Sequence, residues 1–182
     1  LETEIGVWEW TFGAPGAGKS TGAAYIFAML KMAGIKCELV TEFAKDKVYE
    51  ETKEVWNNQQ YIFGKQSFRM GRLKDKVKVV ITDSPLVLSA LYNEDDVLGS
   101  QFDNVVLNVF NQYHNINYFV NRTKPYNPDG RHQTEIESDA LAFVFKKELA
   151  KFNVYYDNIS GDMEGYDFVV NDVLNYLEEQ RC

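Results

Sequence analysis

The stretch that decides the fold of this chain is Gly13-Ala14-Pro15-Gly16-Ala17-Gly18-Lys19-Ser20, and Thr21 follows it directly. It matches the pattern G-x-x-x-x-G-K-[ST] at every fixed position. Glycines at this spacing let the backbone turn tightly and point successive N–H groups at phosphate oxygens, while the amino end of a following helix adds positive partial charge. We expect residues 13–21 to bind the phosphates of a nucleotide, with Lys19 reaching the β- and γ-phosphates and Ser20 binding Mg²⁺.

The residues on both sides of this loop have the composition that such a loop requires. Residues 6–12 before it are rich in aromatic and β-branched side chains, which favours a strand. Residues 21–33 after it are rich in Ala, Leu, Met and Ile, which favours a helix. Because the order is strand, glycine-rich loop, helix, we interpret the loop as a nucleotide-binding element and not as a chance turn.

Length and composition indicate one domain spanning residues 1–182. A chain of 182 residues with 45% hydrophobic content can bury one sizeable core but is short for two.

The sequence has no run of 18 apolar residues and no charged-then-apolar leader, so we expect neither a membrane span nor a signal peptide. Cys37 and Cys182 form no disulfide framework or metal-ligand pattern, which is typical of a reducing compartment and favours the cytoplasm. The net charge of −8 argues against nonspecific nucleic-acid binding by the whole surface.

The rest of the chain alternates between predicted strands and predicted helices. We expect further strands at 35–40, 77–82, 115–120 and 154–156. We expect helices at 46–74 (as one helix or two), 85–92, 100–113, 133–152 and 166–179, with a loop at 158–165. Five strands that alternate with helices predict an α/β fold, in which helices cover both faces of a mostly parallel five-stranded sheet.

Two carboxylates lie just past the carboxyl ends of predicted strands. Glu42 follows the strand at 35–40, and Asp83 ends the β-branched run at 77–82 in the manner of a Walker B strand. Ligands of open α/β sheets bind outside the carboxyl ends of the strands. We therefore expect Asp83 to bind Mg²⁺, directly or through water, or to accept a proton from an acceptor hydroxyl, with Glu42 as the second candidate. The alternatives are that Glu42 complements a helix dipole and that Asp83 caps the next helix.

The predicted helix at 46–74 carries an apolar stripe that two glutamines interrupt. The stripe consists of Trp56, Gln59, Phe63, Gln66, Met70 and Leu73. A buried amide must find hydrogen-bond partners. Gln59 and Gln66 therefore either read the edge of a nucleobase or bind neighbouring backbone.

A second face of the same helix carries positive charge between aromatic rings. Its members are Tyr61, Lys65, Phe68 and Arg72, with Arg69 beside them. Cations interleaved with aromatic rings suit a phosphodiester backbone and stacked bases. The alternative is an ordinary solvated helix surface.

The segment at 121–131 has the strongest loop composition in the chain, with two prolines, a glycine and three cations. This composition predicts a flap, or lid, that orders when a ligand binds. Arg122 and Arg131 are then candidates to stabilise charge on a transferring phosphoryl group. The alternative is that both are ordinary surface arginines.

Several segments together resemble the nucleoside and nucleotide kinase branch of P-loop proteins, and more specifically the small P-loop kinases of tailed bacteriophages. These segments are Phe12 to Thr21, Val40 to Asp46, Gln60 to Gln66, Ile81 to Leu86, and Lys124-Pro125-Tyr126 with Gly130-Arg131. Some members of that phage family phosphorylate 5-hydroxymethyluracil already present in DNA. Where thymidylate and deoxynucleoside kinases usually have Asp-Arg after the third strand, this chain has Asp83-Ser84, which weakens an assignment to free nucleotides.

The resemblance implies an ATP- and Mg²⁺-dependent kinase that phosphorylates the 5-hydroxymethyl group of 5-hydroxymethyluracil in phage DNA. On this interpretation Lys65, Arg69 and Arg72 contact DNA phosphates. The first alternative is a nucleoside or nucleoside monophosphate kinase, in which Gln59 and Gln66 read a free base. The second is a nucleotide-binding regulatory ATPase. The sequence leaves open the acceptor, the general base and the oligomeric state.

Overall fold

The computed structural model describes residues 7–44, 55, 58–94, 97–127 and 134–180. One sheet of five strands runs through these residues in the order β2-β3-β1-β4-β5. Its strands are β1 (Val7–Phe12), β2 (Cys37–Val40), β3 (Val79–Thr82), β4 (His114–Asn121) and β5 (Asp157–Ser160). Every neighbouring pair is parallel, so all five carboxyl ends lie at one edge of the sheet. The predicted parallel α/β fold is confirmed.

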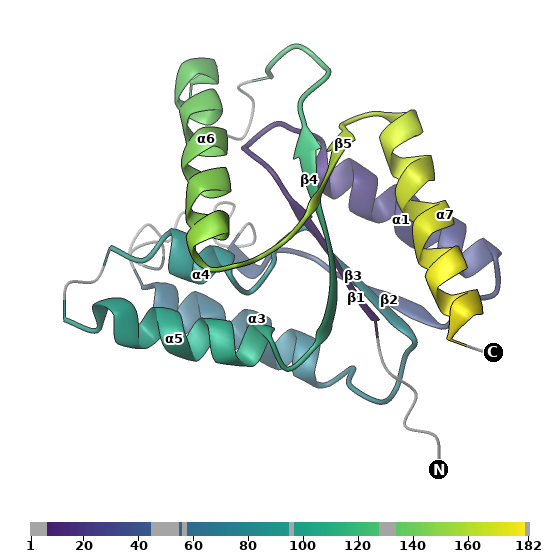
Figure 1. Cartoon of the computed structure of the whole chain (residues 1–182), viewed down its shortest axis with the longest axis horizontal. Coiled ribbons are helices and arrows are strands. Elements are labelled where there is room, and N and C mark those ends of the chain that lie inside the picture. Colours follow the sequence, from purple (N-terminus) through teal and green to yellow (C-terminus); the bar gives the residue numbers. More distant parts are fainter. Residues whose placement is uncertain (1–6, 45–54, 56–57, 95–96, 128–133, 181–182) are drawn as a thin grey trace.

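Helices cover both faces of this sheet (Figure 1). They are α1 (Lys19–Met32), α3 (Gln59–Gly71), α4 (Leu88–Leu91), α5 (Gly99–Phe110), α6 (Glu135–Lys151) and α7 (Met163–Glu179). The α1 and α7 helices pack side by side on one face, while α3, α4, α5 and α6 lie on the other (Figure 1). No helix within the described ranges is both long and apolar enough to cross a membrane.

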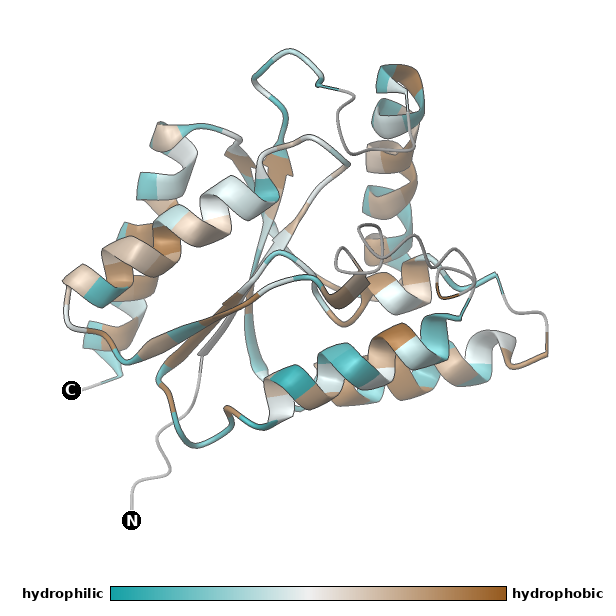
Figure 2. Cartoon of the chain, turned by 180° about the vertical axis from the view of Figure 1, so that it is seen from behind, coloured by the Kyte–Doolittle hydropathy of each residue, from teal (hydrophilic) through white to brown (hydrophobic). Residues whose placement is uncertain are grey.

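The core has two layers, one on each face of the sheet. Tyr118 and Val120 of β4 pack with residues of α1 and α7, while Phe119 between them packs with Phe145 of α6 on the other side. Side chains along a strand alternate in direction, so one strand supplies both layers. All four residues of β3 are buried, as expected for a central strand of a covered parallel sheet. Hydrophobic and hydrophilic residues alternate along the covering helices (Figure 2).

The last strand was predicted in the wrong place. The residues Val154 to Tyr156 have high strand propensity, but β5 is formed by Asp157–Ser160, which begins just before the predicted loop at 158–165 and runs into it. The N–H of Val154 instead donates to the carbonyl of Leu149 at the end of α6, and Tyr155 is 84% exposed. The polar residues of β5 pair in register with β4 and form the edge strand of the sheet. Hydrogen bonding to β4 there outweighs the intrinsic strand propensity of individual residues.

Two predicted helices are shorter in the structure. Of the helix predicted at 85–92, only the single turn of α4, from Leu88 to Leu91, is an α-helix. The residues before it form a turn, in which the carbonyl of Pro85 accepts from the N–H of Leu88. The helix predicted to reach Lys74 ends at Gly71 and is followed by turns. Residues 46–54 and 56–57 of that prediction lie outside the described residues.

Candidate active site

The phosphate-binding loop joins the central strand β1 to the amino end of α1. Gly18 precedes α1 with a φ of 102°, in the left-handed region that favours glycine. A Cβ atom at this position would collide with the hydroxyl oxygen of Tyr166 in α7. The loop also closes on itself, since the N–H of Ala17 donates to the carbonyl of Ala14 at 3.2 Å. The last glycine of the motif is therefore required both by its own backbone and by a neighbouring helix.

Two side chains from distant helices hold the loop. The Tyr166 hydroxyl donates to the carbonyl of Gly18 at 3.0 Å, and the Ser138 hydroxyl in α6 donates to the carbonyl of Pro15 at 2.8 Å. Ser138 is fully buried and Tyr166 nearly so. Neither residue is among the site residues predicted from the sequence. No local pattern identifies them, since both partners lie more than 100 residues away.

Lys19 lies over the loop that precedes it. Its ammonium donates to the carbonyls of Gly13 at 2.7 Å and Ala14 at 3.1 Å. These two acceptors are neutral, so they orient the ammonium without cancelling its charge. Ser20 and Thr21 follow on the exposed side of the first turn of α1. This arrangement suits an anionic ligand that meets the loop, the lysine and the hydroxyl groups together.

Asp83 lies at the carboxyl end of β3, which pairs directly with β1. It is only 5% exposed, and its Oδ1 atom is buried without a hydrogen-bond partner among the described residues. The helix cap considered in the sequence analysis is not what the structure contains, since α4 begins after Val87 and has no side-chain cap. A buried carboxylate oxygen without a partner is costly unless a cation or a donor meets it.

The residues present fit a Mg²⁺ ion that a nucleotide brings with it. Asp83 supplies a carboxylate oxygen without a described partner, and Ser20 is an exposed residue in the first turn of α1. Mg²⁺ is commonly held by one or two protein oxygens together with phosphate oxygens and water. Among the described residues no group of three or more His, Cys, Asp or Glu side chains could hold a metal ion alone. Ser20 and Asp83 as ligands of Mg²⁺ stay a prediction, with which the buried oxygen of Asp83 is compatible.

Glu42 lies in the segment that directly follows β2, between Thr41 and Phe43. Desolvation, and then the charge of nearby Glu42, raises the pKa of Tyr92 to about 12. Phe43 and Ala44 are already helical, so the helix-start role that the sequence analysis allowed for Glu42 is compatible with its place. Its role as a general base stays a prediction.

Gln66 binds main chain. Its Oε1 atom accepts from the N–H of Phe43 at 3.2 Å, and its Nε2 atom donates to the carbonyls of Thr41 at 3.5 Å and Ser84 at 3.4 Å. The base-reading alternative for Gln66 therefore gives way to the main-chain alternative, because backbone groups already occupy its buried amide. Gln59 is half-buried at the amino end of α3, and its role stays a prediction.

The outer face of α3 is basic and aromatic. Phe68 is 73% exposed, and Lys65 and Arg72 are exposed on the same side. The Lys65 ammonium lies 5.4 Å from the centre of the Tyr61 ring. Neither Lys65 nor Arg72 forms an ion pair with a carboxylate in the part of the chain that the structure describes. Hydrophilic residues accordingly cover the carboxyl-terminal half of α3 in Figure 2.

Arg69 differs from its neighbours on α3. Its guanidinium donates to the carbonyl of Thr41 at 3.4 Å and lies 5.1 Å from the centre of the Phe43 ring. Arg69 is therefore turned toward the end of β2, and not along the outer face with Lys65 and Arg72.

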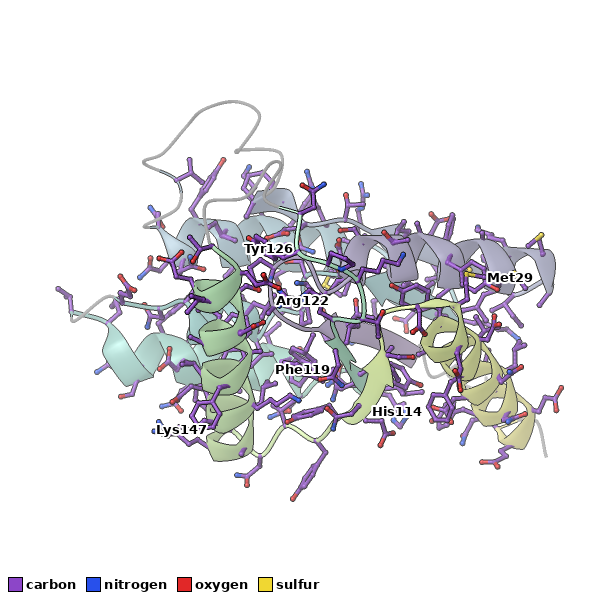
Figure 3. All side chains as sticks on the ribbon, turned by 90° about the horizontal axis from the view of Figure 1, so that it is seen from above. Met29, His114, Phe119, Arg122, Tyr126 and Lys147 are labelled. Carbon is purple, nitrogen blue, oxygen red and sulfur yellow. The ribbon has the colours of Figure 1, made fainter. Side chains whose placement is uncertain are left out.

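Arg122 directly follows β4 and is largely buried. Its guanidinium pairs with Glu135 at 3.0 Å and Asp139 at 2.7 Å, both in α6, and lies 5.3 Å from the centre of the Tyr126 ring. Figure 3 shows Arg122 and Tyr126 together beside α6. Arg122 is thus no ordinary surface arginine, because two carboxylates hold it close to the edge that carries the loop. Arg131, the other flap arginine, lies outside the described residues.

Together, the parallel sheet, the glycine-rich loop and the acid after β3 define a P-loop nucleotide-binding protein with a fold of the nucleoside and nucleotide kinase type. More particularly, the chain belongs to the AAA domain family, whose sequence model matches residues 11–165. A comparison with curated proteins found no significant sequence match.

Three solved structures share this fold at low sequence identity. NadR protein in complex with NR has a TM-score of 0.67 at 15% identity, and the match covers 94% of this chain and 51% of that one. The chain thus spans about half the length of NadR. Thymidylate kinase from Ehrlichia chaffeensis (0.59, 16%) and deoxyadenosine kinase from M. mycoides with bound dATP (0.54, 19%) are matched over 94% of this chain and 99% of theirs. The likeness shows the fold.

Proposed function

We propose that this protein is an ATP- and Mg²⁺-dependent phosphotransferase whose acceptor is a hydroxyl group on a pyrimidine in DNA, specifically the 5-hydroxymethyl group of 5-hydroxymethyluracil. The observation that carries the phosphotransferase is the buried, unpartnered Oδ1 atom of Asp83 on the strand next to the phosphate-binding loop. Among nucleotide-binding folds, an acid at this place serves a phosphoryl-transfer centre. The kinase-type fold supports the same conclusion.

In the proposed reaction, Lys19 and the N–H groups of the loop bind the phosphates of ATP. Ser20 and Asp83 would hold Mg²⁺, which neutralises phosphate charge when it is bound. The acceptor oxygen forms a bond to the γ-phosphorus as the bond from that phosphorus to the β,γ-bridging oxygen breaks, and ADP leaves. Asp83 or Glu42 accepts the proton that the acceptor hydroxyl loses.

The two flap arginines would stabilise charge on the transferring phosphoryl group. Arg122 is poised for this role by its place after β4, next to β1, but its guanidinium is shared with Glu135 and Asp139. Both carboxylates contact the Nη2 atom of this guanidinium. Arg131 lies outside the described residues, and its part in stabilising the transferring phosphoryl group stays a prediction from the sequence.

The outer face of α3 supports DNA as the carrier of the acceptor. Lys65, Phe68 and Arg72 offer two cations and an exposed ring, a combination that binds phosphodiester backbone and unstacked bases. The inner face of the same helix contacts the segments that follow β2 and β3. The same helix therefore offers cations and an exposed ring on one side and contacts the segments that carry Glu42 and Asp83 on the other.

A free nucleoside or nucleotide is the second candidate acceptor. Its support is the fold, which is shared with thymidylate kinase, deoxyadenosine kinase and NadR in complex with NR. On this alternative the cations of α3 are solvated surface, and Gln59 or the flap contacts the acceptor. A regulatory ATPase, the third possibility, would release phosphate without phosphorylating any acceptor.

An acceptor screen tests these proposals. Labelled ATP is incubated with free nucleosides, nucleoside monophosphates, unmodified DNA and DNA containing 5-hydroxymethyluracil, and the nucleosides from each reaction are analysed by mass spectrometry. We expect a phosphorylated 5-hydroxymethyl group only with the modified DNA, and no product with Lys19→Ala. Phosphorylation of free nucleosides alone would contradict the DNA proposal, and free phosphate as the sole product would contradict the kinase.

A further inference from the structure

One buried side chain joins the two chain segments that carry the candidate carboxylates. Gln66 is 2% exposed, and its amide bonds to Thr41 and Phe43 after β2 and to Ser84 after β3. Glu42 lies between the first two of these residues, and Asp83 immediately precedes the third. The β2 and β3 strands pair through their own backbones only as far as Val40 and Thr82. Beyond that point, the Gln66 amide connects the segments.

The local sequence makes Gln66 unusual on its helix. The other buried residues of α3, Ile62, Phe63 and Met70, are apolar. An amide at such a position loses its hydration, so it is tolerated only when both its oxygen and its nitrogen find partners. All three partners of Gln66 are main-chain groups at the carboxyl edge of the sheet. The polar residue therefore connects the helix to the site and adds little to the apolar packing of α3.

We propose that Gln66 is the positioning residue that sets the spacing of Asp83 and Glu42 at the transfer site. This inference rests on the proposed phosphotransferase function. The amide accepts from Phe43 and donates to Thr41 in the segment after β2, and it donates to Ser84 in the segment after β3. A single planar group therefore orients both segments. Arg69 adds a second connection to the Thr41 carbonyl from the next turn of α3. Small displacements of reacting groups lower rates strongly, so loss of the amide acts on turnover more than on nucleotide binding.

The first test removes the amide without leaving a void. Gln66→Met keeps the length of the side chain but has no N–H donor. We expect kcat to fall by about 10- to 100-fold while the KM for ATP changes by less than about twofold. The matched control is Gln101→Met, on the exposed side of α5, which should leave both constants unchanged. Active-site titration measures the fraction of enzyme that is folded and active. If this fraction falls as much as kcat does, the loss reflects stability alone, and the positioning role is overturned.

The second test uses a side chain that regains a donor in acid. In Gln66→Glu, the protonated carboxyl group has a donor and an acceptor as the amide does, whereas the ionised form has only acceptors and adds negative charge near Asp83. We expect the ratio of variant to wild-type kcat to rise as pH falls. A ratio that does not rise as pH falls would contradict the proposal. Gln101→Glu controls for the added charge.

A third measurement needs no substrate. The N–H of Phe43 donates to Gln66, so its hydrogen exchange, followed by NMR, should accelerate in Gln66→Met more than exchange of the N–H groups within α3. Unchanged exchange at Phe43 would overturn the connection itself. Faster exchange in a protein whose wild type phosphorylates no acceptor would instead contradict the proposed function and leave the connection standing.

Discussion

The hydroxyl group of Ser138 donates a hydrogen bond to the carbonyl oxygen of Pro15 at 2.8 Å, and so joins α6 to the phosphate-binding loop across 123 residues of sequence. The same amino-terminal half of α6 carries Glu135 and Asp139, which hold Arg122. One helix therefore contacts both the loop that would bind the donor and the arginine proposed to act on it.

Removing this hydroxyl should loosen the loop. In Ser138→Ala the carbonyl of Pro15 loses its partner from a fully buried side chain, which should lower the free energy of unfolding by about 1 kcal/mol. We also expect a higher KM for ATP, because the loop is less ordered before it binds phosphate. Urea denaturation and steady-state kinetics measure the two effects. Ser67→Ala in α3 is the control, and an effect no larger than in that control would contradict the role of Ser138.

The contact between Gly18 and Tyr166 gives a second prediction. Gly18→Ala places a methyl group against the Tyr166 hydroxyl in a backbone with positive φ, whereas Gly34→Ala imposes positive φ where no atom lies within 4 Å. The control should lose about 1–2 kcal/mol of unfolding free energy from backbone strain alone. Gly18→Ala should lose clearly more and should also bind ATP poorly. Denaturation curves and ATP titration would reveal this, and equal losses would mean that Tyr166 does not constrain the loop.

Replacing the Asp83 carboxylate should lower activity without lowering stability. Asp83→Asn keeps the shape but removes the charge that would bind Mg²⁺, so we expect kcat to fall by about 100-fold or more. Because Oδ1 is buried without a described partner, loss of the charge should leave thermal stability unchanged or raise it. Calorimetry without ligands and kinetics over a range of Mg²⁺ concentrations measure both. A clear loss of stability, compared with Asp157→Asn on β5, would show that the carboxylate has a structural partner.

The amino end of α7 should respond to acid through Asp162. The hydrogen bond from Ser160, and then that from the N–H of Gly165, lowers the pKa of the Asp162 carboxyl below its usual value. A lowered folded-state pKa stabilises the protein above the unfolded-state value, and this contribution is lost as pH falls through the folded-state pKa. Asp162→Ala should therefore lower Tm at pH 7 more than in strong acid. A Tm difference that does not depend on pH would contradict this, with Glu179→Gln as the control.

The outer face of α3 can be tested by the salt dependence of DNA binding. Each of Lys65→Ala and Arg72→Ala should weaken binding for all sequences and reduce the slope of log K against log salt by about 1. Phe68→Ala should weaken single-strand binding by about 1–3 kcal/mol without changing that slope. Fluorescence anisotropy at several salt concentrations gives both quantities. Binding as tight as that of Lys147→Ala, a control on α6, would remove the physical basis of the DNA proposal.

Much of the fold could be predicted because its signals are local. The glycine spacing before Lys19, the β-branched run before Asp83 and the alternation of strands with helices each depend on residues close in sequence. The strand predicted at Val154 failed for the converse reason. Its aromatic and β-branched residues have strand propensity, but hydrogen bonding to β4 selected the polar residues from Asp157 instead.

The candidate site divides in the same way. The sequence by itself determined which residues form the phosphate-binding loop and which acids follow the strands, because backbone turns and strand ends are set by neighbouring residues. Only the tertiary structure decided that Gln66 binds main chain, that Ser138 and Tyr166 hold the loop, and that Arg122 is paired with α6. The physical reason is that a buried polar group takes whichever partner the packing of distant elements brings within reach, and residue spacing along the chain does not specify that partner.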